Sequence, residues 1–150
     1  GNTDFTTEGI LDTTTTLGGA EAGAFDQAIT KTDPAMVMMS LATYQSIDPN
    51  NPAVFSSTII DGHIRNALKY TGVVISDSMS AEALSSYDVS QLGVKLVEAG
   101  GDMSCIGQTD YVKPIVDGLN ERAKSDPAFA SKVTAAATRV MALKIKMGLA

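Results

Sequence analysis

An aspartate directly follows an apolar run in the stretch GVVISDSMS, residues 72–80. The VVIS run has the composition of a short buried strand, so Asp77 stands where that predicted strand ends. In α/β proteins the functional groups gather at the carboxyl ends of parallel strands, where a carboxylate can be held rigidly. The alternative is structural, because an Asp after a strand can also cap the next helix by accepting backbone N–H groups.

Apolar periodicity predicts the elements that would position this carboxylate. Strand-like apolar runs are expected at residues 35–40, 73–76 and 103–107. Helical spacing of apolar residues is expected over residues 19–31, 56–69, 91–99, 110–123 and 126–147. The strands begin about 30 to 37 residues apart, which is the size of a βα unit. The chain is therefore predicted to be α/β, with a parallel sheet and right-handed crossovers.

Residues 1–18 differ from the rest, since they hold seven threonines and have no sustained apolar period. They are predicted to form a loop, and residues 19–150 are predicted to form the βα units. The loop carries three acidic side chains, Asp4, Glu8 and Asp12.

Composition limits the function classes. The 150 residues suit one domain, and 17 acidic against 11 basic residues give a net charge of −6, which disfavours nucleic acid as a partner. Cys105 is the only cysteine, so the chain forms no internal disulfide and no cysteine metal site. No apolar run reaches the roughly 20 residues of a membrane span, and the first residues do not resemble a signal peptide.

Three segments resemble the second half of the catalytic barrel of glycoside hydrolase family 3. They are VMMSLATYQSIDPNNPAVFSSTIIDGHIRNALKYTGVVISDSMSAEAL, then AGGDMSCIG, then AATRVMALKIKMGL. The most specific part is residues 70–79, and the subgroup that looks most similar is the beta-N-acetylglucosaminidases. The resemblance implies the C-terminal portion of a TIM (β/α)8 barrel, with three parallel strands and their flanking helices visible in residues 1–150.

The resemblance implies a retaining glycosidase that acts on terminal beta-linked sugars, and it implies no metal or cofactor. The family nucleophile falls on Asp77, and the expected sugar-contacting residues are Ser78, Met79 and Ser40. A retaining enzyme needs an ionised carboxylate about 5 to 5.5 Å from an acid/base partner.

One position departs from the family pattern. Many members of the subgroup carry an Asp-Ser-His run, in which the His donates the proton and the Asp orients it. Here Thr14 stands two residues after Asp12, and threonine is not a general acid near neutral pH. Asp12 is the preferred donor because it matches the acid of that run, while Asp4, Glu8 or a group outside this chain remain open.

A complete barrel of this type takes about 250 residues. The chain is accordingly expected to be a barrel part that opens inside a loop, with exposed sheet edges and an apolar inner face. Its expected partner is the missing N-terminal half of the barrel or a second copy of the chain.

Two other classes compete with the enzyme. A non-catalytic sugar-binding or structural domain built on the same barrel would explain the absent histidine. A phosphate-accepting receiver domain also ends a strand with Asp, but LATY and GQTD lack the acidic pair and the lysine that it requires.

The remaining candidates have structural interpretations. His63, the only histidine, is expected to have a surface or helix-packing role and not a catalytic one, and Asp102 to shape the turn before the last strand. Bacterial envelope, secreted and cytoplasmic locations are all compatible with this sequence.

Overall fold

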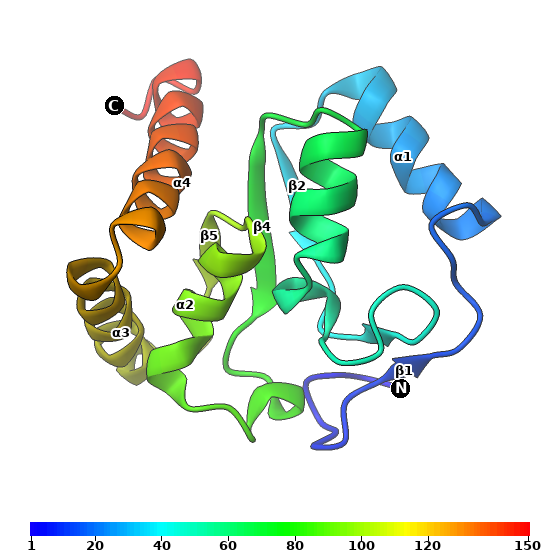
Figure 1. Ribbon diagram of the computed structural model, residues 1–150, viewed down its shortest axis with the longest axis horizontal. Helices are drawn as coiled ribbons and strands as arrows, with labels where there is room; N and C mark the ends of the chain where they lie inside the picture. Colours follow the sequence, from blue (N-terminus) through cyan, green and yellow to red (C-terminus); the bar gives the residue numbers. More distant parts are fainter.

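The computed structural model describes all 150 residues and contains a three-stranded parallel sheet in the order β2-β4-β5. The strands are β2 (Met36–Met39), β4 (Val73–Ser78) and β5 (Met103–Cys105). Met36 pairs with Val73 and Met39 with Ser76, so β2 and β4 run in a regular register. The predicted α/β class with parallel strands is confirmed (Figure 1).

Helices connect and flank these strands as the periodicity predicted. They are α1 (Ala20–Thr32), the π-helix η2 (Thr58–Ala67), α2 (Val89–Ala99), α3 (Val112–Ser125) and α4 (Pro127–Lys146). Three short 3-10 helices lie in the loops, namely η1 (Ala53–Phe55), η3 (Glu82–Leu84) and η4 (Thr109–Tyr111). None of these helices is both long enough and apolar enough to span a membrane.

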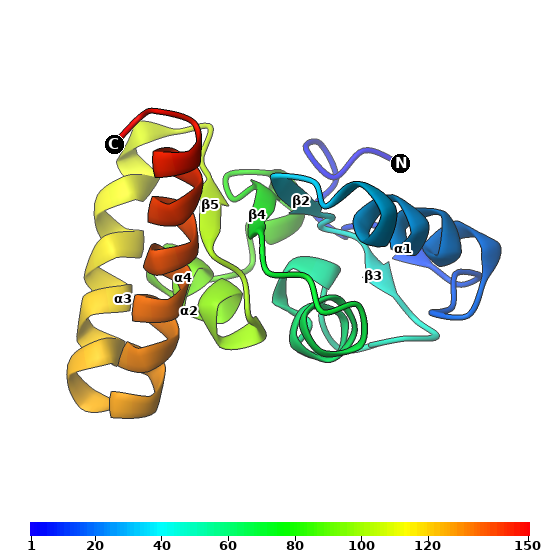
Figure 2. The same cartoon turned by 90° about the horizontal axis from the view of Figure 1, so that it is seen from above.

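The core lies between the sheet and the helices η2 and α2. Figure 2 shows both helices on the same face of the sheet, and no helix on the opposite face. Ile60, Val74, Leu92 and Leu96 are at most 1% exposed and belong to one apolar cluster. Burying these side chains stabilises the packing of η2 and α2 on the sheet.

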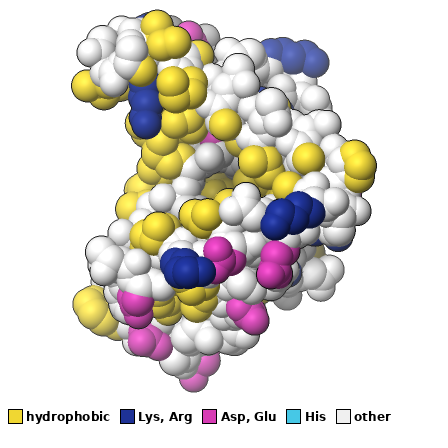
Figure 3. Space-filling model, turned by 90° about the vertical axis from the view of Figure 1, so that its left-hand side faces the viewer, with side chains coloured by type: hydrophobic (Ala, Val, Ile, Leu, Met, Phe, Trp, Pro, Cys, Tyr) yellow, Lys and Arg dark blue, Asp and Glu magenta, His cyan; other side chains and the backbone are white.

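The opposite face of the sheet is open. Met36 and Met38 of β2 are 40% and 65% exposed, although the continuous apolar run at residues 35–40 is typical of a strand buried on both faces, and that interpretation is wrong here. The apolar face of α1 is also largely open, because Phe25 is 71% exposed and Ile29 is the only buried residue of this helix. Figure 3, a view from the side of α3 and α4, shows a hollowed face on which hydrophobic side chains gather.

Two helix ends are fixed by identifiable caps, and a third helix begins without one. Asp126 caps α4 by accepting the N–H groups of Ala128 and Phe129. Gly100 ends α2 in the left-handed conformation at φ 103°, which a glycine adopts without strain. Asp110 does not cap α3, because the 3-10 turn η4 comes first and places Tyr111 at the helix start.

Candidate active site

Asp77 lies at the carboxyl end of β4 and is half-buried. Its Oδ1 accepts a 2.7 Å hydrogen bond from the N–H of Ser78, and its Oδ2 has no hydrogen-bond partner in the protein. The helix-cap interpretation is wrong, since α2 is capped by Asp88, whose side chain accepts the N–H of Ser90. The carboxylate is thus fixed by its own strand end and keeps one oxygen free.

The chain on either side of Asp77 is tied to the end of β5. Ser76 Oγ accepts the N–H of Cys105 at 2.9 Å, and the carbonyl of Cys105 accepts the N–H of Met79 at 2.9 Å. Ser80 Oγ lies 3.1 Å from Ser78 Oγ and accepts the N–H of Gly107 at 3.2 Å. These contacts hold the ends of β4 and β5 together where the candidate site lies.

The expected sugar contacts divide into accessible and buried residues. Ser78 is half-exposed beside Asp77, and Ser40 is half-buried with its Oγ accepting the N–H of Ala42 at 3.0 Å. Met79 is 0% exposed and belongs to the main apolar cluster, so its expected contact with the sugar is wrong. The N–H of Met79 bonds to the carbonyl of Cys105, and its side chain packs into the core.

The N-terminal loop runs past the carboxyl ends of the strands (Figure 1). It contains β1 (Leu11–Asp12), which pairs in parallel with β3 (Thr43–Tyr44) and was not predicted. Nearer the N-terminus, the carbonyl of Thr3 accepts the N–H of Ala83. Ala83 lies in η3, which follows Asp77 in the chain. The loop is therefore joined both to the segment after β2 and to the segment after β4.

Asp12 is held in this loop by the threonines that follow it. Its carboxylate accepts hydrogen bonds from the N–H of Thr15 at 2.7 Å, the N–H of Thr14 at 2.9 Å and the hydroxyl of Thr15 at 2.8 Å. These bonds, the backbone N–H of Thr15 first, hold the pKa of Asp12 below its usual value. In this arrangement Asp12 is ionised at neutral pH, which is the state of a base or an orienting group and not of a proton donor.

Asp12 lines a cavity that does not include Asp77. A cavity of about 250 Å³ lies between α1, β2 and η2; it includes Asp12, Ser40 and Tyr44 in its wall but not Asp77. The wall is mostly apolar and also includes Asp26 of α1 and His63 of η2, whose Nε2 lies 2.8 Å from the Asp26 carboxylate. The expected helix-packing role of His63 is confirmed, because this pair joins two helices.

Potential metal ligands are not clustered in the structure, since no group of three or more His, Cys, Asp or Glu side chains is arranged to hold an ion.

One charged group whose role the sequence did not indicate is a buried carboxylate at the opposite end of the sheet. Asp102, expected only to shape a turn, has a fully buried side chain that pairs with Arg65 and Arg139 and accepts the N–H of Val74 at 2.8 Å. Burial lowers the pKa of Arg65, and the charge of Asp102 opposes this shift. No sequence signal connects the three charged residues, because each arginine is 37 positions from Asp102.

Comparison with known proteins places this geometry in a family. The chain is 35% identical to the beta-N-acetylhexosaminidase of Beutenbergia cavernae, with a TM-score of 0.88 over 96% of this chain and 43% of that one. A glycoside hydrolase family 3 beta-N-acetylglucosaminidase of Paenibacillus sp. is 27% identical, with a TM-score of 0.82 over 93% of this chain and 27% of that one. An uncharacterized secreted glycosyl hydrolase of Arthroderma benhamiae is 36% identical over 69 residues, which are 45% of this chain and 20% of that protein.

The chain spans less than half the length of each of these relatives. Residues 6–143 match the family model described as the glycosyl hydrolase family 3 N terminal domain. This match covers most of the parallel βα architecture and includes Asp77. The chain therefore belongs to glycosyl hydrolase family 3.

Proposed function

We propose that this chain is part of a retaining glycosidase domain in which Asp77 is the nucleophile. The observation that carries the proposal is the position of its carboxylate, half-exposed at the carboxyl end of β4 with a free Oδ2, in a family 3 chain. A nucleophile must be ionised and rigidly aimed, and a strand end supplies this rigidity better than a mobile loop.

The reaction would proceed by double displacement. Asp77 Oδ2 attacks the anomeric carbon, and the glycosidic bond breaks as a general acid protonates the leaving oxygen. Water, deprotonated by the same group, then attacks the glycosyl ester and frees Asp77. The names of the similar structures favour a terminal beta-linked N-acetylglucosaminide as the substrate. Ser78 and Ser40 are the proposed sugar-contacting side chains.

Asp12 is the proposed proton donor, but its hydrogen bonds to Thr14 and Thr15 set a condition on this role. The carboxylate must leave the N–H groups of Thr14 and Thr15 before it can carry a proton near neutral pH. The loop 1–18 would therefore rearrange when substrate binds, as active-site loops commonly do. Asp4, Glu8 or a group outside this chain are the other donors to be tested.

A complete site also requires the open face of the sheet to be covered. Met36 and Met38 expose apolar surface there, and β2 is an edge of the three-stranded sheet. We propose further barrel strands as the covering partner, supplied by the same polypeptide or by a second chain.

The test of the proposed nucleophile is Asp77→Asn in the complete protein, assayed on an aryl beta-N-acetylglucosaminide. The substitution keeps the shape of the side chain and removes its charge, so turnover is expected to fall by at least about 1,000-fold with the melting temperature unchanged. A fluorinated sugar with a good leaving group should add covalently to wild-type Asp77, and mass spectrometry would locate the adduct. Near-normal turnover by Asp77→Asn would exclude the role.

A second candidate, a sugar-binding domain without hydrolysis, is favoured by two features of the loop. Thr14 stands at the position of the family histidine, and Asp12 is held ionised. Binding of the sugar by the complete protein with no turnover of an aryl glycoside would favour this candidate.

A further inference from the structure

The pairing of β4 with β5 contains one extra residue next to Asp77. Ile75 pairs with Met103 and Ser78 pairs with Cys105, so β4 advances three residues while β5 advances two. Side-chain alternation ends at this point, because Ser76 is buried and both Asp77 and Ser78 are half-exposed. An extra residue of this kind is a β-bulge, which bends the strand and changes the direction of a side chain.

The buried hydroxyl of Ser76 bonds across this bulge. Ser76 is 0% exposed, and its Oγ accepts the N–H of Cys105 at 2.9 Å. A hydroxyl in an otherwise apolar run costs free energy of burial unless it is paired, and this bond provides the pairing. On the far side of Asp77 the carbonyl of Cys105 accepts the N–H of Met79, so Cys105 is bonded to both flanks of the carboxylate.

We propose that Ser76 is a positioning residue for the nucleophile, acting through the bulge. Its hydroxyl fixes Cys105 against β4, which keeps the extra residue at Asp77 and aims the carboxylate out of the sheet. This inference rests on the proposed role of Asp77. Attack on an anomeric carbon tolerates little misplacement, since about 1 Å of displacement can cost roughly 100-fold in rate.

The experiment compares Ser76→Ala with Ser76→Cys in the complete protein. Ser76→Ala removes only the hydroxyl, and we expect kcat on an aryl beta-N-acetylglucosaminide to fall about 10- to 100-fold with KM changed less than about 3-fold. Ser76→Cys keeps the shape with a weaker acceptor and should give an intermediate kcat. The matched control is Ser104→Ala on the adjacent strand, because the half-buried Ser104 side chain makes no hydrogen bond.

Hydrogen exchange of the Cys105 amide gives a readout that does not depend on catalysis. The exchange should be faster by about 10-fold or more in Ser76→Ala and unchanged in Ser104→Ala. Wild-type kcat in Ser76→Ala together with faster exchange would overturn the positioning role. Unchanged exchange in Ser76→Ala would show that the hydrogen bond to the Cys105 amide does not form. An equal loss of kcat in Ser104→Ala would overturn a specific role of Ser76, because any perturbation of the strands would then have the same effect.

Failure of this inference is separate from failure of the proposed function. If Asp77→Asn abolishes turnover and Ser76→Ala does not reduce it, only the positioning role is lost. If Asp77→Asn keeps its turnover, the nucleophile assignment is lost and the positioning role falls with it, whatever the exchange rate of Cys105.

Discussion

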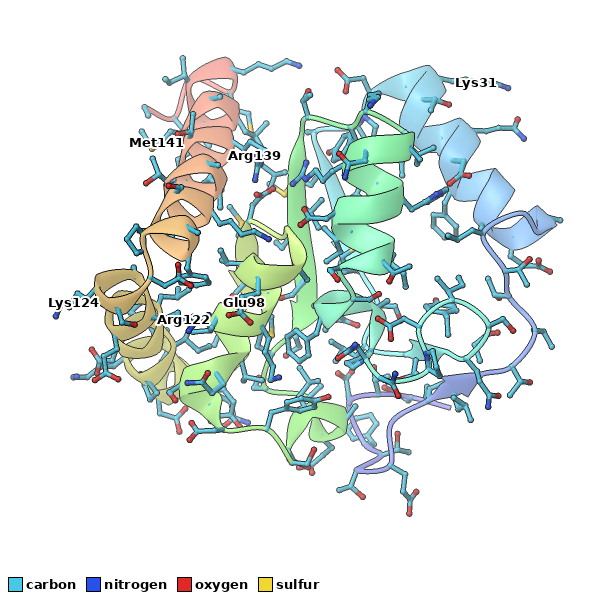
Figure 4. The ribbon with its side chains drawn as sticks, in the orientation of Figure 1. Lys31, Glu98, Arg122, Lys124, Arg139 and Met141 are labelled. Atoms are coloured by element: carbon cyan, nitrogen blue, oxygen red, sulfur yellow. The ribbon has the colours of Figure 1, made fainter.

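Arg139 of α4 lies 2.8 Å from the carboxylate of Asp102, whose side chain is fully buried next to the start of β5. The same carboxylate pairs with Arg65 of η2 and accepts the N–H of Val74 in β4. Figure 4 shows Arg139 on the side of α4 that faces the strands, whereas Met141 points away from them. One carboxylate therefore joins a terminal helix, an internal helix and the sheet at the end away from Asp77.

Substitution of Asp102 by alanine should destabilise the fold strongly. Arg65 is only 12% exposed, so the change leaves a buried guanidinium without its counter-charge. Removing one partner of a buried pair costs about 3–5 kcal/mol, and urea denaturation should show a loss of this size.

A surface ion pair provides the control. Glu98 and Arg122 lie 3.2 Å apart and are each 46% exposed, so Glu98→Ala should change stability by less than about 1 kcal/mol (Figure 4). If Asp102→Ala and Glu98→Ala reduced the free energy of unfolding equally, burial would not make the Asp102 ion pairs more stabilising than a surface pair.

Local sequence patterns predicted the elements because each depends on neighbouring residues. The apolar runs and helical spacings place the parallel strands and the helices from α1 to α4 within a few residues. The exposure of Met38 and Phe25 could not be predicted in the same way, because it depends on what lies across the open face.

The candidate site was predictable only as far as a single residue. The position of Asp77 at a strand end follows from the apolar run before it, whereas the bulge beside it depends on the register of two strands about 30 residues apart in sequence. The lowered pKa of Asp12 depends on hydrogen bonds that form only when the loop folds back on Thr15, and the burial of Met79 depends on tertiary packing.

Close packing of α2 against α3 gives a second stability prediction. A Cβ added at Gly118 would overlap the carbonyl oxygen of Ser90, which is backbone and cannot move aside without shifting the helix. Gly118→Ala should therefore reduce the free energy of unfolding by at least about 1–3 kcal/mol, measured by urea denaturation.

The matched control is Gly23→Ala in α1, where a Cβ would meet nothing within 4 Å. Alanine is the better helix former, so this variant should gain about 0.5–1 kcal/mol or remain unchanged. A stable Gly118→Ala variant would show that α2 and α3 can separate without loss.

Asp12 as proton donor predicts a dependence on the leaving group. In the complete protein, Asp12→Ala should slow hydrolysis of a poor leaving group by about 100- to 10,000-fold and spare an activated aryl glycoside, which needs no protonation. Asp4→Asn and Glu8→Gln are the matched controls. A uniform loss for both substrates would assign Asp12 to binding or orientation, and a selective loss in Asp4→Asn or Glu8→Gln would move the donor to that residue.

The lowered pKa of Asp12 adds a pH dependence with a defined sign. A carboxyl group whose pKa is lower in the folded state contributes stability above its unfolded pKa of about 3.9, and this stability is lost as the pH falls through the lowered value. Titration of the Asp12 carboxyl by NMR should have its midpoint below that of an unfolded peptide. Thr15→Ala removes one of the hydrogen bonds and should raise the midpoint, while Thr13→Ala should not, because Thr13 does not bond to Asp12.

If the open face of the sheet is covered in the complete protein, Met38→Glu should have a small effect on residues 1–150 alone and a large effect on the complete protein. Met38 is 65% exposed in the structure of this chain, so Met38→Glu should change the stability of residues 1–150 alone by less than about 1 kcal/mol. In the complete protein further strands would bury this side chain, and an unpaired charge there should cost several kcal/mol and lower the melting temperature. Asn66→Glu, at an exposed position of η2, adds the same charge on the covered side of the sheet and should be neutral in both settings. If Met38→Glu were neutral in the complete protein as well, the face of β2 that bears Met38 would be open to water there too, and its proposed barrel partner would have to lie elsewhere.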